Sequence, residues 1–127
     1  MIFEYDCTIP AVTPKESPYK KRLKLTWGII HKLEIISSYA CAGLVYCSIW
    51  QGEHQVFPTN PDHAFRLTGN PISGKEFFEL IEPPWELEFR GWAPDAIYPH
   101  TVIVRFWMLR PHQLMPFSEY QWKARGL

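Results

Sequence analysis

Apolar and polar residues alternate with a period of two in several short stretches of the chain. The alternation is strict in residues 2–9 (IFEYDCTI) and 85–91 (WELEFRG), and residues 100–110 form the longest and most β-branched run. A period of two predicts strands with one buried face and one solvated face. In the last run, the residues expected on the buried face are Val102, Val104, Phe106 and Met108.

Turn residues separate further short apolar segments, so that predicted strands follow one another about every ten residues. These segments are residues 21–27, 29–36, 44–50, 55–57, 65–68, 72–73 and 77–81. Only residues 74–81 (GKEFFELI) can also be interpreted as one or two helical turns. Seven to nine short strands at this spacing predict an all-β chain folded as an antiparallel, jelly-roll-like β-sandwich.

The chain is long enough for one domain, since 127 residues divided between two cores would leave each core marginal. We expect the sandwich to occupy residues 1–110. Three of the twelve prolines fall in residues 10–20, which are predicted to form an extended arm or a long crossover. Residues 111–127 form an apolar C-terminal extension, which is expected either to pack on its own domain or to dock on another chain.

Charge and cysteine content narrow the class of protein. Thirteen basic and thirteen acidic residues give a net charge of zero, which argues against general nucleic-acid binding. The first residues are acidic where a signal peptide is basic, and no apolar run is long enough to cross a membrane. Three cysteines without short-spaced pairs predict reduced thiols. We therefore expect synthesis in a cytoplasm and no membrane partner.

The sequence offers few groups suited to metal binding or nucleophilic catalysis. The five histidines lack the close spacing of zinc ligands. Asp62 and His63, together with His54 or His100, would form a cupin-like metal site if the fold brought them together. Histidines scattered over loops are the more common explanation. Cys47 lies inside an apolar strand, as expected of an unreactive core thiol.

Glu86 and Glu88 are paired carboxylates on one predicted strand face, and two such groups in a cleft can hydrolyse glycosidic bonds. A solvated polar strand face next to Arg90 explains the two carboxylates without a catalytic role. The sequence contains neither a nucleophile elbow nor a phosphate-binding glycine loop. We therefore expect no enzyme activity, no catalytic residues, no metal and no cofactor.

Tryptophans are the most informative candidate site residues. Trp92 ends a predicted strand, and Trp50 and Trp107 lie opposite the inward residues of their strands. Such rings either stack on sugars or cover a subunit interface, where tryptophan and tyrosine are enriched. The apolar C-terminal extension favours the interface. The residues expected there are Tyr19, Leu114, Phe117, Tyr120 and Trp122.

Several longer phrases resemble small proteins encoded among the structural genes of tailed bacteriophages. The phrases are YDCTIPAVTPKESP (5–18), LKLTWGIIHKLEI (23–35), CAGLVYCSIWQGEHQVFPTNPD (41–62) and ELIEPPWELEFRGWAPDAIYPHTVIVRFWML (79–109). The resemblance covers about residues 3–110 and includes no catalytic signature. It implies a virion component with a β-sandwich or jelly-roll fold, such as a capsid decoration or tail-associated protein.

Together these features predict a non-enzymatic structural or assembly protein that acts through contacts with other subunits, either copies of itself or capsid and tail proteins. Its expected location is the virion, after synthesis in the host cytoplasm. The alternative is a carbohydrate-binding β-sandwich module that uses Trp50, Trp92 or Trp107. A cupin-like metal-dependent enzyme is a further alternative.

Overall fold

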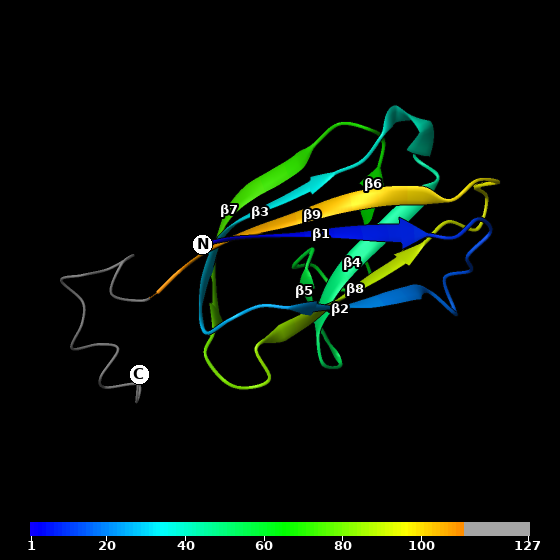
Figure 1. Cartoon of the computed structure of the whole chain (residues 1–127). Helices are drawn as coiled ribbons and strands as arrows, with labels where there is room; N and C mark the ends of the chain where they lie inside the picture. Colours follow the sequence, from blue (N-terminus) through cyan, green and yellow to red (C-terminus); the bar gives the residue numbers. More distant parts are fainter. Residues whose placement is uncertain (111–127) are drawn as a thin grey trace.

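Nine strands and one short 3-10 helix make up residues 1–110, the part of the chain that this computed structural model describes (Figure 1). They are β1 (Ile2–Ile9), β2 (Tyr19–Lys24), β3 (Gly28–Ile36), η1 (Tyr39–Cys41), β4 (Val45–Gln51), β5 (His54–Phe57), β6 (Phe65–Leu67), β7 (Ile72–Leu80), β8 (Glu86–Trp92) and β9 (His100–Leu109). The expectation of an all-β chain of seven to nine strands is confirmed. Within the same residues, no helix has the length and apolar character needed to span a membrane.

The strands form two antiparallel sheets packed against each other. The first sheet has the order β1-β9-β3-β7, and the second has the order β2-β8-β4-β5, with β6 also paired to β4. Figure 1 shows β7, β3, β9 and β1 as one layer across the sandwich from β2, β8 and β5. The pairs are nested, because β1 pairs with β9, β2 with β8, β3 with β7, and β4 with β5 and β6. The predicted antiparallel β-sandwich is thus confirmed.

The period-two alternation decides which side chains fill the space between the sheets. On β9, Val102, Val104, Phe106 and Met108 are all fully buried, as the sequence predicts. Every second residue of a strand points to the same face of the sheet, so these four residues all point into the core. Other fully buried side chains come from both sheets and include Ile9, Ile35, Ile49, Leu87 and Phe89.

β7 differs from the sequence-based expectation of two short strands or a helical turn. Residues 72–80 form one continuous strand, and the helical interpretation of residues 74–81 is wrong. Among residues 1–110 the strand lies at the edge of the first sheet and pairs only with β3, from Gly28 opposite Leu80 to Ile35 opposite Ile72. An edge strand can expose both faces, so residues 73–77 carry no alternating pattern that would reveal them.

The Pro-rich connection between β1 and β2 crosses from the first sheet to the second. The Val12 amide donates a hydrogen bond to the Ala96 carbonyl oxygen at 2.9 Å, and Thr13 forms a β-bridge with Ala93. The Thr13 hydroxyl also donates to the carbonyl oxygen of Pro10, at 2.6 Å. These contacts hold the connection against the β8–β9 loop. The predicted extension, residues 111–127, lies outside the described residues.

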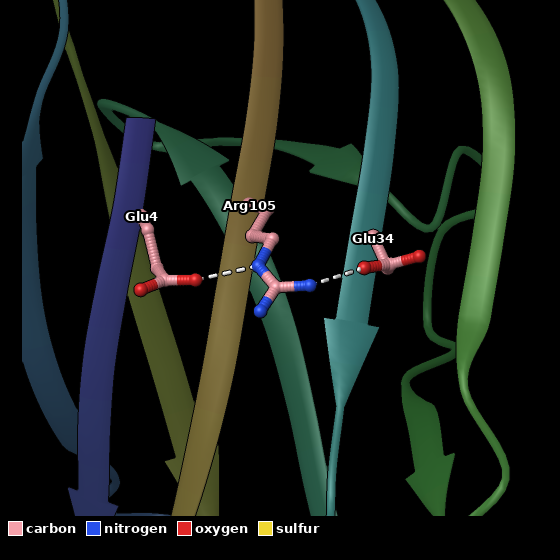
Figure 2. A network of polar contacts seen from close by, with 3 residues as sticks. All are labelled: Glu4, Glu34 and Arg105. Atoms are coloured by element: carbon pink, nitrogen blue, oxygen red, sulfur yellow. Dashed lines mark hydrogen bonds and ion pairs between the residues drawn. The ribbon is translucent and has the colours of Figure 1, made fainter. Parts of the chain in front are cut away.

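A network of charged side chains joins three strands on the outer face of the first sheet. Arg105 of β9 lies opposite both Glu4 of β1 and Glu34 of β3. Its Nε donates to Glu4 at 2.5 Å and its Nη1 donates to Glu34 at 2.9 Å, as Figure 2 shows. The hydrogen bond to Glu4, followed by the one to Glu34, raises the pKa of the Arg105 guanidinium. The cation therefore spans two carboxylates in direct register across the sheet.

Candidate functional site

The outer face of the second sheet carries a groove with a volume of about 480 Å³, which we call the outer-sheet groove. Its floor comes from β4 and β8, and its walls come from the β4–β5 turn, the loop between β5 and β6, and the β1–β2 connection. The lining residues are Lys15, Pro18, Ser48, Trp50, Glu53, His54, Gln55, Thr59, Pro61, Asp62, His63, Ala64, Arg90 and Trp92.

The sequence of β4 explains why the sheet is hollowed here. Tyr46, Ser48 and Trp50 point outward in turn, so a small side chain lies between two large aromatic ones. Across the ladder, Tyr46 lies opposite Trp92, and Ser48 lies opposite Arg90. The small Ser48 side chain is itself buried, and it leaves room for the Trp50 indole to lie against it.

Trp50 is held in place by polar contacts on its edge and on its face. Its indole Nε1 donates a hydrogen bond to Ser48 Oγ at 2.8 Å. The guanidinium of Arg90 lies 4.1 Å from the centre of the Trp50 ring, within the range of a cation–π interaction. Arg90 is oriented in turn by an ion pair with Glu88. These contacts fix the orientation of Trp50 before any ligand arrives.

Trp92 forms the other aromatic part of the outer-sheet groove. Its ring stacks on Tyr46, with ring centres 6.2 Å apart and planes inclined by 12°. The Lys15 Nζ lies 5.8 Å from the centre of the same ring. Trp92 is half-buried, and it therefore offers part of its surface to the groove.

Gln55 holds together the loop that forms one wall of the groove. Its side-chain Nε2 lies 2.8 Å from the carbonyl oxygen of Pro58, 3.2 Å from that of Asn60 and 3.0 Å from that of His63. One amide group thus serves three backbone acceptors across six residues of chain. Asp62 adopts a positive φ of 65°, a conformation that aspartate tolerates better than most residues.

The cupin-like hypothesis is only partly matched by the geometry. His54, Asp62 and His63 do line the same groove, whereas His100 lies at one end of the sandwich in a different surface depression. No group of three or more His, Cys, Asp or Glu side chains in residues 1–110 is arranged to hold a metal ion.

Burial explains the Cys47 thiol, and ion pairs explain the paired carboxylates, without a catalytic role for either. Cys47 is fully buried, and burial raises the pKa of its thiol, which matches the expected core cysteine. Glu86 forms an ion pair with Arg22 at 3.3 Å, and Glu88 forms one with Arg90. The two carboxylates therefore each have a cationic partner, as expected of a solvated polar face.

A second candidate surface lies at the end of the sandwich opposite the N-terminus (Figure 1). Large apolar side chains are exposed there in η1 and in the β8–β9 loop: Tyr39 by 77%, Ile97 by 75% and Tyr98 by 69%. Leu44, Ile97 and Tyr98 border a depression of about 620 Å³ between residues 38–44 and 95–101. We call this surface the apolar end and define it by the residues Val12, Tyr39, Leu44, Ile97 and Tyr98.

The structure separates the tryptophans that the sequence analysis grouped. Trp50 and Trp92 share the outer-sheet groove, whereas Trp107 lies on β9 of the other sheet, with Lys32 Nζ 4.7 Å from its ring centre. Tyr19 is half-buried, and its ring packs edge-on against Phe89 at 6.3 Å. The other expected interface residues, Leu114, Phe117, Tyr120 and Trp122, lie outside the described residues.

The apolar end could not be predicted from the sequence, because its residues lie in loops and in the short η1, where no period marks them. Exposure of Ile97 and Tyr98 depends on how the β8–β9 loop leaves the sandwich, which composition does not reveal. A run of apolar residues between Pro94 and Pro99 was the only available signal.

The fold and the two surfaces define an antiparallel β-sandwich with a polar-aromatic groove on one sheet and an apolar end. A scan against protein-family models and a search of curated proteins find no match to the chain.

Proposed function

We propose that this protein is a non-enzymatic assembly protein, a virion component of a tailed phage, that binds other protein subunits through the apolar end. The observation that carries the proposal is the exposure of Leu44, Ile97 and Tyr98 around one surface depression at the end of the sandwich. Contiguous exposed apolar side chains mark interaction surfaces, whereas single ones need no explanation.

The nested strand pairing supports the same proposal. Each strand of the first half of the chain pairs with a strand of the second half, and successive pairs alternate between the two sheets. With β5 and β6 both paired to β4, this is the arrangement of a jelly roll. Viral capsid domains commonly use this fold, although other functions use it too. The phrases that resemble phage structural proteins agree with the capsid analogy.

The physical basis of the contact is burial of apolar surface. Removing apolar area from water stabilises an interface by about 25 cal/mol per Å², before the cost of association is subtracted. Aromatic residues such as Tyr39 and Tyr98 contribute large areas at low cost in side-chain entropy. A chain with zero net charge also generates little repulsion between its copies.

The first partner to test is a second copy of the same chain. Light scattering after gel filtration should give an oligomer for the full chain. The double substitution Ile97→Asp and Tyr98→Asp should give a monomer, because it places two charges in the proposed contact. Ile2→Asp is the matched control, since Ile2 is an exposed aliphatic residue at the other end of the sandwich and its substitution should leave the oligomer intact.

Two results contradict self-assembly through the apolar end. A wild-type chain that stays monomeric at every concentration would exclude self-assembly through this surface. An oligomer that survives the Ile97→Asp, Tyr98→Asp substitution would show that another surface makes the contact.

A further inference from the structure

We propose that the outer-sheet groove is a binding site for a neutral oligosaccharide. This function is separate from the subunit contact proposed for the apolar end, because the groove lies on the face of the second sheet. Its volume of about 480 Å³ falls within the range of small-molecule sites, roughly 300–1,000 Å³.

The aromatic part of the groove suits the apolar faces of sugar rings. A pyranose presents C–H groups on its faces, and these pack on the face or edge of an indole. Trp92 contributes a half-buried ring next to Tyr46, and Trp50 contributes a second half-buried ring, on which the Arg90 guanidinium lies. Two aromatic side chains in one groove can contact successive sugar units.

The polar part of the groove suits hydroxyl groups, which both donate and accept hydrogen bonds. Glu53, His54, Asp62 and His63 are exposed along the rim, and they supply carboxylate acceptors and imidazole groups. They come from the β4–β5 turn, from the start of β5 and from the loop between β5 and β6. A ligand lying across Trp50 and Trp92 would therefore have polar side chains within the same groove.

The charges that line the groove favour a neutral ligand over an anionic one. Lys15 and Arg90 are matched by Glu53 and Asp62, so the lining residues carry no net positive charge. Arg90 is further neutralised by its ion pair with Glu88. Recognition of phosphate or nucleic acid needs clustered cations without such partners.

The groove is formed before a ligand binds, which lowers the entropic cost of binding. Gln55 fixes the loop wall through its contacts with three carbonyl oxygens. Trp50 is held by Ser48 and Arg90. The side chains at the floor therefore have little conformational freedom to lose.

A proline-rich peptide is the other ligand that an aromatic groove commonly accepts. The geometry favours the sugar, because a peptide presents backbone carbonyl oxygens that need N–H donors, and Trp50 and Arg90 already donate to acceptors within the protein. The indole N–H of Trp50 already donates to Ser48 Oγ. The rim is rich in carboxylates, which match sugar hydroxyls better than peptide carbonyls.

The experiment is a calorimetric and tryptophan-fluorescence titration of the full chain with cellohexaose, chitohexaose, maltohexaose and mannohexaose. A sulfated oligosaccharide and a decaproline peptide serve as ligands of the competing classes. At least one neutral hexasaccharide should bind saturably with a Kd below about 1 mM. Trp92→Ala should weaken that binding by about tenfold or more, equivalent to the loss of about 1.4 kcal/mol.

Trp107→Ala is the matched control, because Trp107 is also a half-buried outer-face tryptophan near a lysine, but on the other sheet. Its substitution should leave the affinity unchanged. Asp62→Asn is a second test that preserves size and tolerance of a positive φ, and it should also weaken binding. Far-ultraviolet circular dichroism checks that each variant is folded.

The inference is overturned if no neutral hexasaccharide binds, if decaproline or the sulfated sugar binds more tightly, or if Trp92→Ala and Asp62→Asn both retain full affinity. Its failure is distinguishable from that of the assembly proposal. The Ile97→Asp, Tyr98→Asp variant keeps an intact groove, so it should lose the oligomer and still bind the sugar.

Discussion

At the scale of single residues, the three cysteines illustrate how the fold changes the chemistry of a side chain. Cys7 of β1, Cys41 of η1 and Cys47 of β4 are all buried and free. Burial raises the pKa of the Cys7 thiol from 9.0 to about 12, with nearby Asp6 adding to the effect and Lys21 opposing it. Burial also raises the pKa of Cys47. Both thiols therefore stay protonated, which suits core packing and not nucleophilic attack.

These raised pKa values predict a loss of stability at alkaline pH. Between about pH 9 and pH 12, the unfolded chain releases thiol protons that the folded chain retains. The free energy of unfolding therefore falls as the pH rises, by at most about 1.4 kcal/mol per pH unit for each thiol. Urea unfolding of the reduced protein at a series of pH values measures this slope.

Cys7→Ala is the control for the alkaline effect. Burial also raises the pKa values of Tyr5 and Tyr19, so the wild-type slope contains contributions from both phenols. Removing the Cys7 thiol should make the slope shallower without abolishing it, because Cys47 and Tyr5 keep their raised pKa values. The contribution of Tyr19 should also shrink, since the Cys7 thiolate adds to the rise in its pKa. An unchanged slope in the variant would exclude Cys7 as a source of alkaline instability.

At the scale of strands, the sequence predicts an element well when one face is buried and the other is solvated. The segments 2–9, 85–91 and 100–110 meet this condition and appear as β1, β8 and β9 with small shifts at their ends. β7 does not meet it, because a sheet edge imposes no alternation on residues 73–77. Its pairing with β3 is a long-range contact that no local pattern encodes.

A glycine inside β8 shows how closely the two sheets approach. A Cβ atom added at Gly91 would lie 2.5 Å from Ile9 Cδ1 and 2.9 Å from Phe89 Cε1. Gly91→Ala should therefore destabilise the protein by about 1–3 kcal/mol, the usual cost of overpacking a core. Urea or thermal unfolding measures the change.

Gly74→Ala is the matched substitution, because Gly74 is also a strand glycine, but no atom of the described residues lies within 4 Å of its added Cβ. Its free energy of unfolding should stay within about 0.5 kcal/mol of the wild type. Equal effects at the two positions would contradict the interpretation of Gly91 as a site of close packing between β8 and β1.

At the scale of the whole molecule, the sequence predicts the fold class and the absence of helical period, but not the assembled surfaces. It identifies Trp50, Trp92 and Trp107 as outward residues, yet their grouping depends on which strands pair. β4 and β8 are neighbours in the second sheet, so Trp50 and Trp92 line one groove, whereas β9 carries Trp107 to the first sheet. The groove therefore depends on the pairing of β4 with β8.

The shared core predicts that the two sheets unfold together. Ile35 of β3 and Ile49 of β4 are both fully buried, one in each sheet. Ile→Val at either position removes one methylene from the space between the sheets, and it should lower the free energy of unfolding by about 0.5–1.5 kcal/mol. Circular dichroism and tryptophan fluorescence should report one coincident transition for each variant.

Two separate transitions, with each substitution shifting only the transition of its own sheet, would mean that the sheets are independent units. In that case the outer-sheet groove could persist after the first sheet unfolds, and sugar binding would outlast the loss of β9 structure. Coincidence instead ties the groove to the integrity of the whole sandwich.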